Sequence, residues 1–209
     1  MSAVSAPSRR GRRARAKTGY HHGSLRRALL DAALALIERD GPEGFTLRAA
    51  AREAGVTSGA PYHHFPDKEA LVAALAEEGF TMLESAIRAA GEDHADPLER
   101  AHEMAVAYVR FAAEHPTHFR VMMGRDARRL KNPGLSLAAV RAYELMRDAV
   151  VEKTRAHEDA AAREELVLGS WSIVHGLAFL VIDGHVGGRK WAEQEPIVRR
   201  TIARMEVGE

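Results

Sequence analysis

Apolar residues recur at intervals of three and four through almost all of this chain, and this periodicity restricts its fold more than any other feature of the sequence. Leu25, Leu29, Ala32 and Leu36 are one example, because their spacing places all four on one face of a helix. No segment alternates apolar and polar residues between turn signals, as a half-buried strand does. We therefore predict an all-α fold. The chain has 209 residues, of which 46% are hydrophobic, and this is enough to build a core.

Glycine and proline divide the N-terminal part into short helices. Gly41 and Pro42 end the first predicted helix, and Thr46 is placed to cap a second one, which Gly55 ends. Small residues form the buried face of this second helix and allow a third helix to cross it closely, with Val56 filling the gap. These small residues are Ala50, Ala51 and Ala54.

The third predicted helix is short and exposed. Thr57 or Ser58 is expected to cap it, and it extends to about His63, so that Pro61 lies in its first turn, where a missing N–H is harmless. A fourth helix, which opens at Asp67 and continues to about residue 90, is roughly 36 Å long and able to join two domains. This succession has the spacing of a helix-turn-helix, whose third helix enters the major groove of DNA.

The remainder of the chain has helical periodicity as well. We expect helices over residues 98–114, 119–123, 164–183 and 196–205. A further helix is expected to begin after the turn at residues 132–134 and to extend to about residue 157. The chain thus divides into a basic arm of residues 1–20, which we expect to be disordered, a DNA-binding domain of residues 21–75 and a C-terminal domain of residues 76–209.

Charge is distributed unevenly along the chain. The net charge is +1, but the first 70 residues contain 12 Lys and Arg against 7 Asp and Glu, and the remainder contains 18 against 22. A basic front end on an acidic body is typical of a protein that binds a polyanion at one end. Six cations lie in the arm, where they either follow the DNA backbone or only make the chain more soluble. They are Arg9, Arg10, Arg12, Arg13, Arg15 and Lys17.

Several classes of protein are disfavoured by what the sequence lacks. The absence of cysteine rules out disulfides and thiolate metal sites, and it suits the cytoplasm, where we expect the protein. No apolar run reaches the roughly 20 residues of a membrane-spanning helix, and no secretory signal is recognisable, so we expect no membrane partner. His115 and His118 flank Pro116 with no third ligand nearby. Without a nucleophile elbow or a phosphate-binding loop, we expect no enzyme, no cofactor and no metal.

Four short motifs occur in a distinctive order in the helix-turn-helix region. They are Thr46-Leu47-Arg48, Ala54-Gly55-Val56-Thr57, Tyr62-His63-His64-Phe65 and Asp67-Lys68-Glu69-Ala70-Leu71. At these residues the chain resembles the TetR/AcrR family of transcription regulators, over about residues 24–75. Three further segments are similar to one branch of that family: Gly19-Tyr20-His21-His22-Gly23, Gly59-Ala60-Pro61-Tyr62, and the Trp-x-x-x-His-Gly motif of Trp171, His175 and Gly176.

The resemblance implies an Ω-shaped, all-helical homodimer in which each DNA-binding domain reads half of a palindromic operator, with half-sites about 34 Å or more apart in double-stranded DNA. It also implies roles for single residues. Tyr62, Lys68 and Thr46 would bind phosphates, and Arg48, Ser58 and His63 would face base edges. Tyr62 as a merely packed aromatic and His63 as an ordinary surface or core histidine stay open as alternatives. The predicted DNA-binding set is Thr46, Arg48, Thr57, Ser58, Gly59, Pro61, Tyr62, His63 and Lys68.

Aromatic and methionine side chains recur at helical spacing in the C-terminal domain. Trp171, His175 and Phe179, for example, follow one another at four-residue intervals on one helix face. Such residues form either ordinary core or the lining of a cavity for a small, largely apolar effector. His175 would be a polar handle or a buried histidine bonded to a backbone carbonyl. The candidate ligand-binding residues are Met104, Tyr108, Phe111, Phe119, Met122, Trp171, His175 and Phe179.

The resemblance, together with the length of the fourth helix, implies an effector-released repressor, in which the effector moves the long helix of residues 67–90. The segments 164–183 and 196–205 would form the dimer interface that the resemblance implies. A ligand-responsive activator of the same fold is an alternative. A non-specific architectural DNA-binding protein is less favoured, because the acidic C-terminal domain would be idle in it, and so is a histidine-dependent enzyme.

Overall fold

The computed structural model describes residues 22–124, 127, 130–154 and 160–206, so the predicted basic arm lies outside the described residues. Within these ranges the chain forms helices and no strand, which confirms the all-α prediction. The helices are α1 (His22–Asp40), α2 (Leu47–Glu53), the short 3-10 helix η1 (Ala60–His63), α3 (Lys68–Glu92), α4 (Pro97–Glu114), α5 (Pro116–Met123), α7 (Pro133–Thr154), α8 (Ala160–Ile182) and α9 (Trp191–Glu206).

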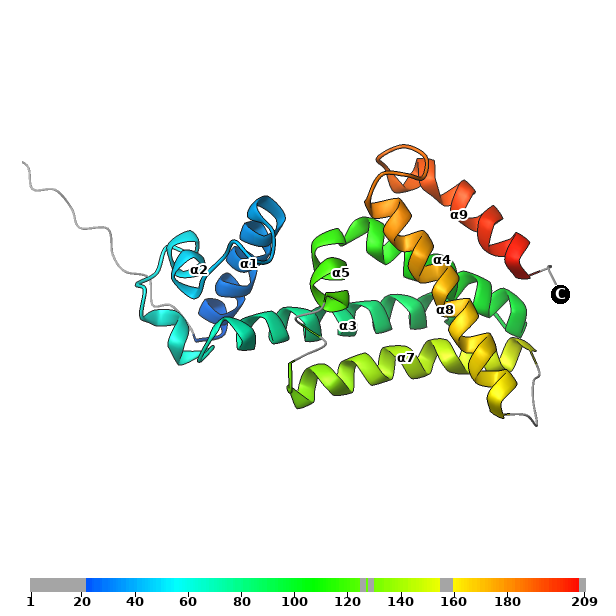
Figure 1. Ribbon diagram of the computed structural model, residues 1–209, viewed down its shortest axis with the longest axis horizontal. Coiled ribbons are helices and arrows are strands. Elements are labelled where there is room, and N and C mark those ends of the chain that lie inside the picture. The colour runs from blue at the N-terminus through cyan, green and yellow to red at the C-terminus, as the bar shows by residue number, and fades with distance from the viewer. Residues whose placement is uncertain (1–21, 125–126, 128–129, 155–159, 207–209) are drawn as a thin grey trace, which may run out of the picture.

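One long helix, α3, joins two parts of the molecule (Figure 1). α1, α2 and η1 gather around its start and form, with that start, the part called the head below. α3 then continues into the second part, called the body, where it packs against α4, α5 and α7. α8 covers α4 and α7, and α9 lies against α4 and α8. The 25 residues of α3 are the long connecting helix that the sequence predicts.

Polar side chains fix where these helices begin. Thr46 Oγ1 accepts a hydrogen bond from the N–H of Ala49 at 3.1 Å, as predicted for the cap of α2, and Asp67 Oδ1 accepts from the N–H of Ala70 at 2.7 Å. Asp96 caps α4 in the same way. Each oxygen satisfies backbone donors that have no partner within the helix. The starts of α2, α3 and α4 are therefore set locally.

A single apolar core extends through the head and the body. Phe45 and Phe65 are 1% and 3% exposed in the head, and Tyr108 and Phe119 are equally buried in the body. Val56 packs against this core while staying partly exposed. Because one cluster of buried side chains includes residues of α1, α3 and α4, apolar contact holds the head to the body.

The third helix of the head differs from the prediction. Neither Thr57 nor Ser58 caps it, because it is a 3-10 helix of four residues that follows Gly59 and has no side-chain cap. Pro61 does lie in its first turn, as expected. The tighter 3-10 geometry is usual for such short helices, which cannot complete the longer α-helical bonds.

The last helix begins at Trp191, whereas the sequence places its start at Pro196. Gln194 explains the difference, since it is only 4% exposed and its side-chain amide donates to the carbonyl of Gly188 at 2.8 Å. This buried contact anchors the first turn of α9 to the preceding loop. Pro196 is therefore accommodated inside the helix, at the expense of one backbone hydrogen bond.

α8 is more apolar than its sequence pattern suggested. It contains an 18-residue window with a mean hydropathy of 1.7, which is sufficient by length and composition to cross a membrane, and 28% of that window is buried. The expectation that no segment is long enough is therefore not upheld. Leu168, Ile173 and Leu180 are 59%, 37% and 48% exposed on this helix. α8 packs against the body on one side and leaves large apolar side chains open on the other.

Gly55 offers a test of the turn that follows α2. Its φ is +71°, and a Cβ there would meet no atom within 4 Å, so Gly55→Ala adds backbone strain and no clash. We expect this change to lower the free energy of unfolding by about 1–2 kcal/mol. Gly59→Ala is the matched control, because Gly59 has an ordinary φ of −86° and equally open surroundings. Equal losses for the two variants in urea denaturation at fixed protein concentration would contradict this interpretation.

Candidate DNA interface and ligand cavity

The turn between α2 and η1 gives the head its helix-turn-helix geometry. Gly55 takes the left-handed conformation, its N–H donates to the carbonyl of Arg52 at 3.1 Å, and the N–H of Val56 donates to the carbonyl of Ala51 at 2.9 Å. These two bonds are those of a Schellman motif, which ends a helix and redirects the chain. Ala50 is 0% exposed, so α2 presents a small, closely packed face to its neighbours. η1 is thereby held across the end of α2.

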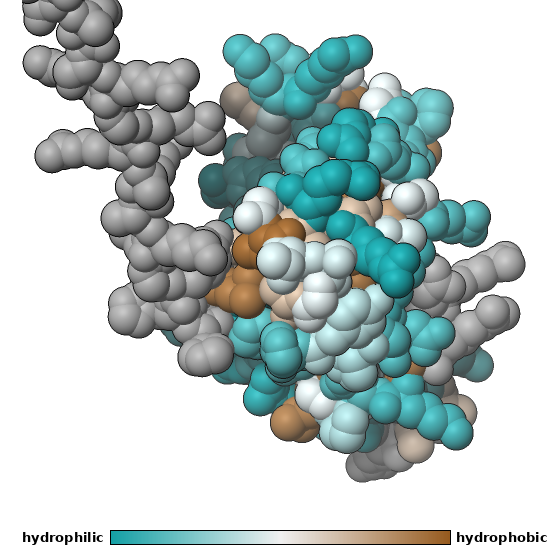
Figure 2. All heavy atoms as spheres, turned by 90° about the vertical axis from the view of Figure 1, so that its left-hand side faces the viewer, coloured by the Kyte–Doolittle hydropathy of each residue, from teal (hydrophilic) through white to brown (hydrophobic). Residues whose placement is uncertain are grey.

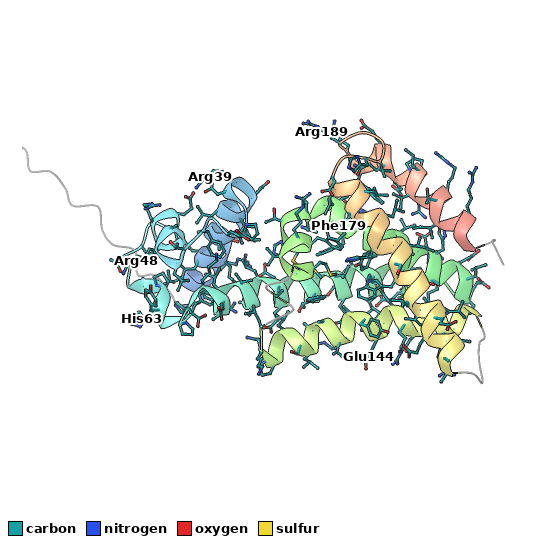
Figure 3. All side chains as sticks on the ribbon, viewed as in Figure 1. Arg39, Arg48, His63, Glu144, Phe179 and Arg189 are labelled. Carbon is teal, nitrogen blue, oxygen red and sulfur yellow. The ribbon has the colours of Figure 1, made fainter. Side chains whose placement is uncertain are left out.

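Most of the residues predicted to contact DNA are exposed at the free end of the head. Figure 3 shows Arg48 and His63 at the end of the molecule away from the body. Figure 2 looks onto that end and shows a mainly hydrophilic surface. Pro61, in contrast, is buried, so its ring is not available to DNA and we leave it out of the proposed contacts. The exposed members of the set are Thr46, Arg48, Thr57, Ser58, Gly59, Tyr62 and His63.

Lys68 has contacts within the head that the sequence does not reveal. Its Nζ lies 4.7 Å from the centroid of the Phe45 ring and 3.4 Å from the carbonyl oxygen of Glu43. A cation over an aromatic face is stabilised by the ring electrons, so Lys68 ties the start of α3 to the loop before α2. Lys68 is half-buried, and an ammonium has three N–H donors. The hydrogen bond to Glu43 uses one of them.

Two adjoining cavities lie in the body. The larger, of about 330 Å³, is bounded by α3, α4, α5, α7 and α8, and the smaller, of about 90 Å³, lies between α4, α7, α8 and α9. Among the described residues, no Asp, Glu, Lys or Arg lines the larger cavity. Arg147 lines the smaller one. The side chains that line both, and so form the wall between them, are Tyr108, Tyr143, Met146 and Trp171.

A chain of hydrogen bonds contains most of the polar groups of this wall. Tyr108 Oη lies 2.8 Å from His175 Nδ1, and the indole N–H of Trp171 donates to the same phenol. We assign the donor role to Tyr108, because the proton of this buried phenol has no other acceptor among its hydrogen-bond partners, and Nδ1 of His175 then accepts. Burial raises the pKa of Tyr108 well above its usual value, and the hydrogen bond from Trp171 opposes that rise more weakly. The phenol is therefore protonated, and it is a partner of His175 that the sequence did not predict.

The eight predicted ligand-binding residues divide between the cavities and the core. Phe119 is 0% exposed and meets Tyr108 and Phe179 edge-on, with ring centroids 5.6 and 5.5 Å apart, so it forms a layer behind the cavity wall. Phe111 lines a separate groove between α3 and α4. The members that line one or both cavities are Met104, Tyr108, Met122, Trp171 and His175.

The sequence prediction missed many of the residues that line the cavities, among them four large apolar or aromatic ones on α3 and α7. Phe80 and Leu83 come from α3, and Tyr143 and Met146 come from α7. Their apolar spacing was visible in the sequence, but the sequence does not say which helix faces meet. α7 in particular packs against α3, α4 and α8 at once.

A chain of polar contacts connects the head to the cavity wall. Arg27 on α1 donates from Nη1 to Glu78 Oε2 on α3 at 2.5 Å, and Glu78 Oε1 lies 3.1 Å from His118 Nε2 on α5. One turn after His118 comes Met122, which lines the larger cavity. At Gly79, α3 and α5 are so close that a Cβ would lie 3.0 Å from Met122 Sδ. Head, connecting helix and cavity wall are therefore in direct contact.

Family comparisons agree with this arrangement of a helix-turn-helix and a helical body. Residues 29–75 match the model of bacterial regulatory proteins of the tetR family, and residues 101–205 match that of the tetracyclin repressor-like C-terminal domain. The chain belongs to the TetR family. The resemblance stated from the sequence is thus confirmed, and this TetR-family chain is a DNA-binding transcriptional regulator.

Individual relatives cover different shares of the TetR-family chain. The HTH-type transcriptional repressor KstR2 of Mycobacterium tuberculosis is 34% identical over 103 residues, so the chain matches about half the length of that relative. A protein of unknown function from Rhodococcus sp. RHA1 has a TM-score of 0.73 and 34% identity, with 90% of this chain and 98% of that one covered. The TetR-family regulator PfmR of Thermus thermophilus has a TM-score of 0.66 and 21% identity, with 87% and 95% covered. The relatives with an assigned role are transcriptional regulators.

Tyr108→Phe tests the hydrogen-bond chain in the wall. The change keeps the ring contacts but leaves Nδ1 of His175 and the indole N–H of Trp171 without the phenol, so we expect the free energy of unfolding to fall by about 1 kcal/mol. Tyr143→Phe is the matched control, because Tyr143 lines the same cavities and is 37% exposed. Tyr143→Phe should lower the free energy of unfolding by less than about 0.5 kcal/mol. If urea denaturation shows that Tyr143→Phe lowers the free energy of unfolding as much as Tyr108→Phe does, the proposed chain of hydrogen bonds is wrong.

Proposed function

We propose that this TetR-family regulator is a dimeric repressor that binds a palindromic operator and leaves it when a small molecule occupies the cavities of the body. One observation carries the proposal: a single helix serves both parts. α3 begins with Lys68 in the head, and Phe80 and Leu83 of the same helix line the larger cavity. An occupant that displaces α3 in the body therefore moves the head.

The exposed end of the head would enter the major groove. Arg48, Ser58 and His63 would face base edges, since guanidinium, hydroxyl and imidazole groups all form hydrogen bonds with them. Thr57 and Gly59 are exposed beside them. Their small size allows the backbone to approach the DNA closely, as shape readout requires.

Three further residues would hold phosphates. Thr46 Oγ1 accepts from the N–H of Ala49, and its own hydroxyl proton remains for a phosphate oxygen. Tyr62 is 51% exposed, which supports a phenol that donates to the DNA backbone. Lys68 would contribute a charge from the base of α3. Such contacts fix the register of the head on DNA without selecting a sequence.

The route from the cavity to the head would pass through α5 and α3. A molecule that displaces Met122 shifts α5 against α3 at Gly79, where the two helices are in close contact. His118 on α5 and Arg27 on α1 share Glu78, so the same shift would change the side-chain contacts of Glu78 that hold the head. To move a two-state equilibrium from 1:99 to 99:1, a ligand must bind one state about 5.5 kcal/mol more tightly than the other.

The open face of α8 supports the dimer. Gly169, Ser172 and Gly176 recur along it, and no atom lies within 4 Å of a Cβ built at either glycine. Leu168 and Leu180, which are 59% and 48% exposed, flank this row of small residues. Small residues let two helices approach closely, and the apolar flanks gain by leaving water. A second copy of α8 would cover both.

Tyr62→Phe and Lys68→Met test the phosphate contacts. Both changes should weaken binding to the operator and to unrelated DNA alike. For Tyr62→Phe we expect an affinity about fivefold lower, because one hydrogen bond is lost. Lys68→Met should also lower the slope of log affinity against log salt by about 0.9, because one phosphate is no longer neutralised. Arg39→Ala, on α1 away from the labelled Arg48 and His63 (Figure 3), is the control and should change neither quantity. Unchanged DNA affinity in both test variants would refute these two assignments.

Gly176→Leu tests the dimer interface. Leucine favours a helix and its side chain enters open space in a single chain, so we expect unchanged circular dichroism but a dimer dissociation constant raised by about tenfold or more. Sedimentation velocity measures the constant. Ala89→Leu, at an exposed position of α3, is the control and should keep the wild-type dimer. Wild-type association of the Gly176 variant would mean that another surface forms the dimer.

Genomic footprinting of the bound protein tests the function as a whole. We expect protected sites with two-fold symmetry, and increased transcription of the adjacent genes when the regulator is deleted. Reduced transcription on deletion would identify an activator instead. Protected sites without symmetry would contradict binding as a two-fold dimer.

A further inference from the structure

We infer that the cavities of the body accept an uncharged, largely apolar molecule that presents an oxygen able to accept a hydrogen bond, such as a carbonyl oxygen. This inference rests on the proposed function, because it names the chemical class of that effector. Three properties of the cavity walls support it: their charge, the direction of their hydrogen bonds and their deformability.

The charge of the walls favours an uncharged molecule. Among the described residues, the titratable groups that line the larger cavity are Tyr108, Tyr143 and His175. Arg147 lines the smaller cavity, but its guanidinium donates to Asp148 Oδ1 at 2.8 and 3.2 Å, so its charge is already balanced. Transfer of an ionised group from water to apolar surroundings without a partner costs several kcal/mol. A carboxylate ligand would have to compete with Asp148 or remain unpaired.

The direction of the hydrogen bonds favours an acceptor. Trp171 donates to Tyr108, and Tyr108 donates to Nδ1 of His175. This order places the proton of neutral His175 on Nε2, so the ring offers no acceptor to a ligand. Tyr143, which lines both cavities, carries a hydroxyl proton that it can donate. A carbonyl oxygen complements the hydroxyl of Tyr143, whereas a group that only donates finds no acceptor on His175.

The wall between the cavities is made of side chains, so it can yield to an elongated molecule. Tyr143 meets Trp171 edge-on at 6.1 Å, and Met146 lies beside both cavities. Met122 and Met123 also line the larger cavity. Methionine is unbranched and adapts its shape to an occupant. A volume of about 330 Å³ is within the range of small-molecule sites.

Two fluorescent probes separate charge from shape. N-phenyl-1-naphthylamine is uncharged, and 8-anilinonaphthalene-1-sulfonate has the same skeleton with one added sulfonate. In titrations of the full chain, we expect the uncharged probe to bind with a dissociation constant about tenfold or more below that of the sulfonate. Equal or tighter binding of the sulfonate, or no binding of either probe, would overturn the inference.

Ala139→Phe locates the bound probe. Ala139 lines the larger cavity, so a phenyl group there should weaken binding of N-phenyl-1-naphthylamine by about tenfold or more. Leu137→Phe, on the same helix with 56% exposure, is the control and should leave it unchanged. Should Ala139→Phe fail to fold, Val140→Trp fills the same cavity from a position that is 49% exposed. Unchanged binding in a folded cavity variant would place the probe elsewhere.

Prodan, an uncharged naphthalene with one carbonyl, tests the acceptor. Its emission moves to longer wavelength when the carbonyl accepts a hydrogen bond, so His175→Phe or Tyr143→Phe should move the emission of the bound probe to shorter wavelength. Unchanged emission in both variants would refute the hydrogen-bonding part of the inference. Sedimentation and DNA footprinting of the same preparations distinguish a wrong ligand class from a wrong assignment as a repressor. A dimeric, operator-bound protein that prefers the sulfonate refutes the ligand class alone, whereas absent operator binding with normal probe preference refutes the repressor.

Discussion

The burial of α3 along its whole length is the interaction on which the other features of the molecule depend. Leu71 and Leu75 in the head and Leu83 and Ile87 in the body are each at most 1% exposed and recur at four-residue intervals, in a row that winds gradually around the helix. Each such side chain contributes about 2 kcal/mol by leaving water, and a helix of this length without that packing is marginal. Gly79 occupies the middle of this row and admits α5 at close range. Because buried side chains follow one another from the head into the body, packing supports α3 on both sides of the junction.

α8 has a cavity-lining face and an exposed face that are both apolar, which explains its composition. The Trp-x-x-x-His-Gly motif is divided between them. Trp171 and His175 line the cavities, whereas Gly176 belongs to the open row of small residues. In the dimer that we propose, the helix that carries the polar groups of the ligand site is thus also the helix that meets the partner. Occupation of the cavities and the geometry of the two heads would then be linked through one rigid element from each subunit.

Local chemistry made the head largely predictable from the sequence, and tertiary contacts limited the rest. Thr46 and Gly55 specify a cap and a left-handed turn through their own side-chain chemistry, so both were recognised. The start of α9 was not, because it depends on the burial of Gln194 against a loop carbonyl. The predicted set of cavity-lining residues was incomplete for the same reason. Tyr143 lies on an apolar stripe like many core residues, and only the meeting of α7 with α4 and α8 places it at a cavity.

The charge of the chain separates affinity for DNA from selection of a sequence. Residues 22–70 contain six Lys and Arg against seven Asp and Glu, and both Arg27 and Arg39 are in ion pairs within the head. The folded head therefore has almost no net attraction for a polyanion, and its proposed contribution consists of hydrogen bonds and fit. The six cations of residues 1–20, if they follow the DNA backbone, would supply the opposite kind of contribution, which depends on salt and not on sequence. In the proposed mechanism, an effector that tilts the heads would have to cancel only the first contribution, so it would remove the regulator from its operator without having to remove it from DNA as a whole.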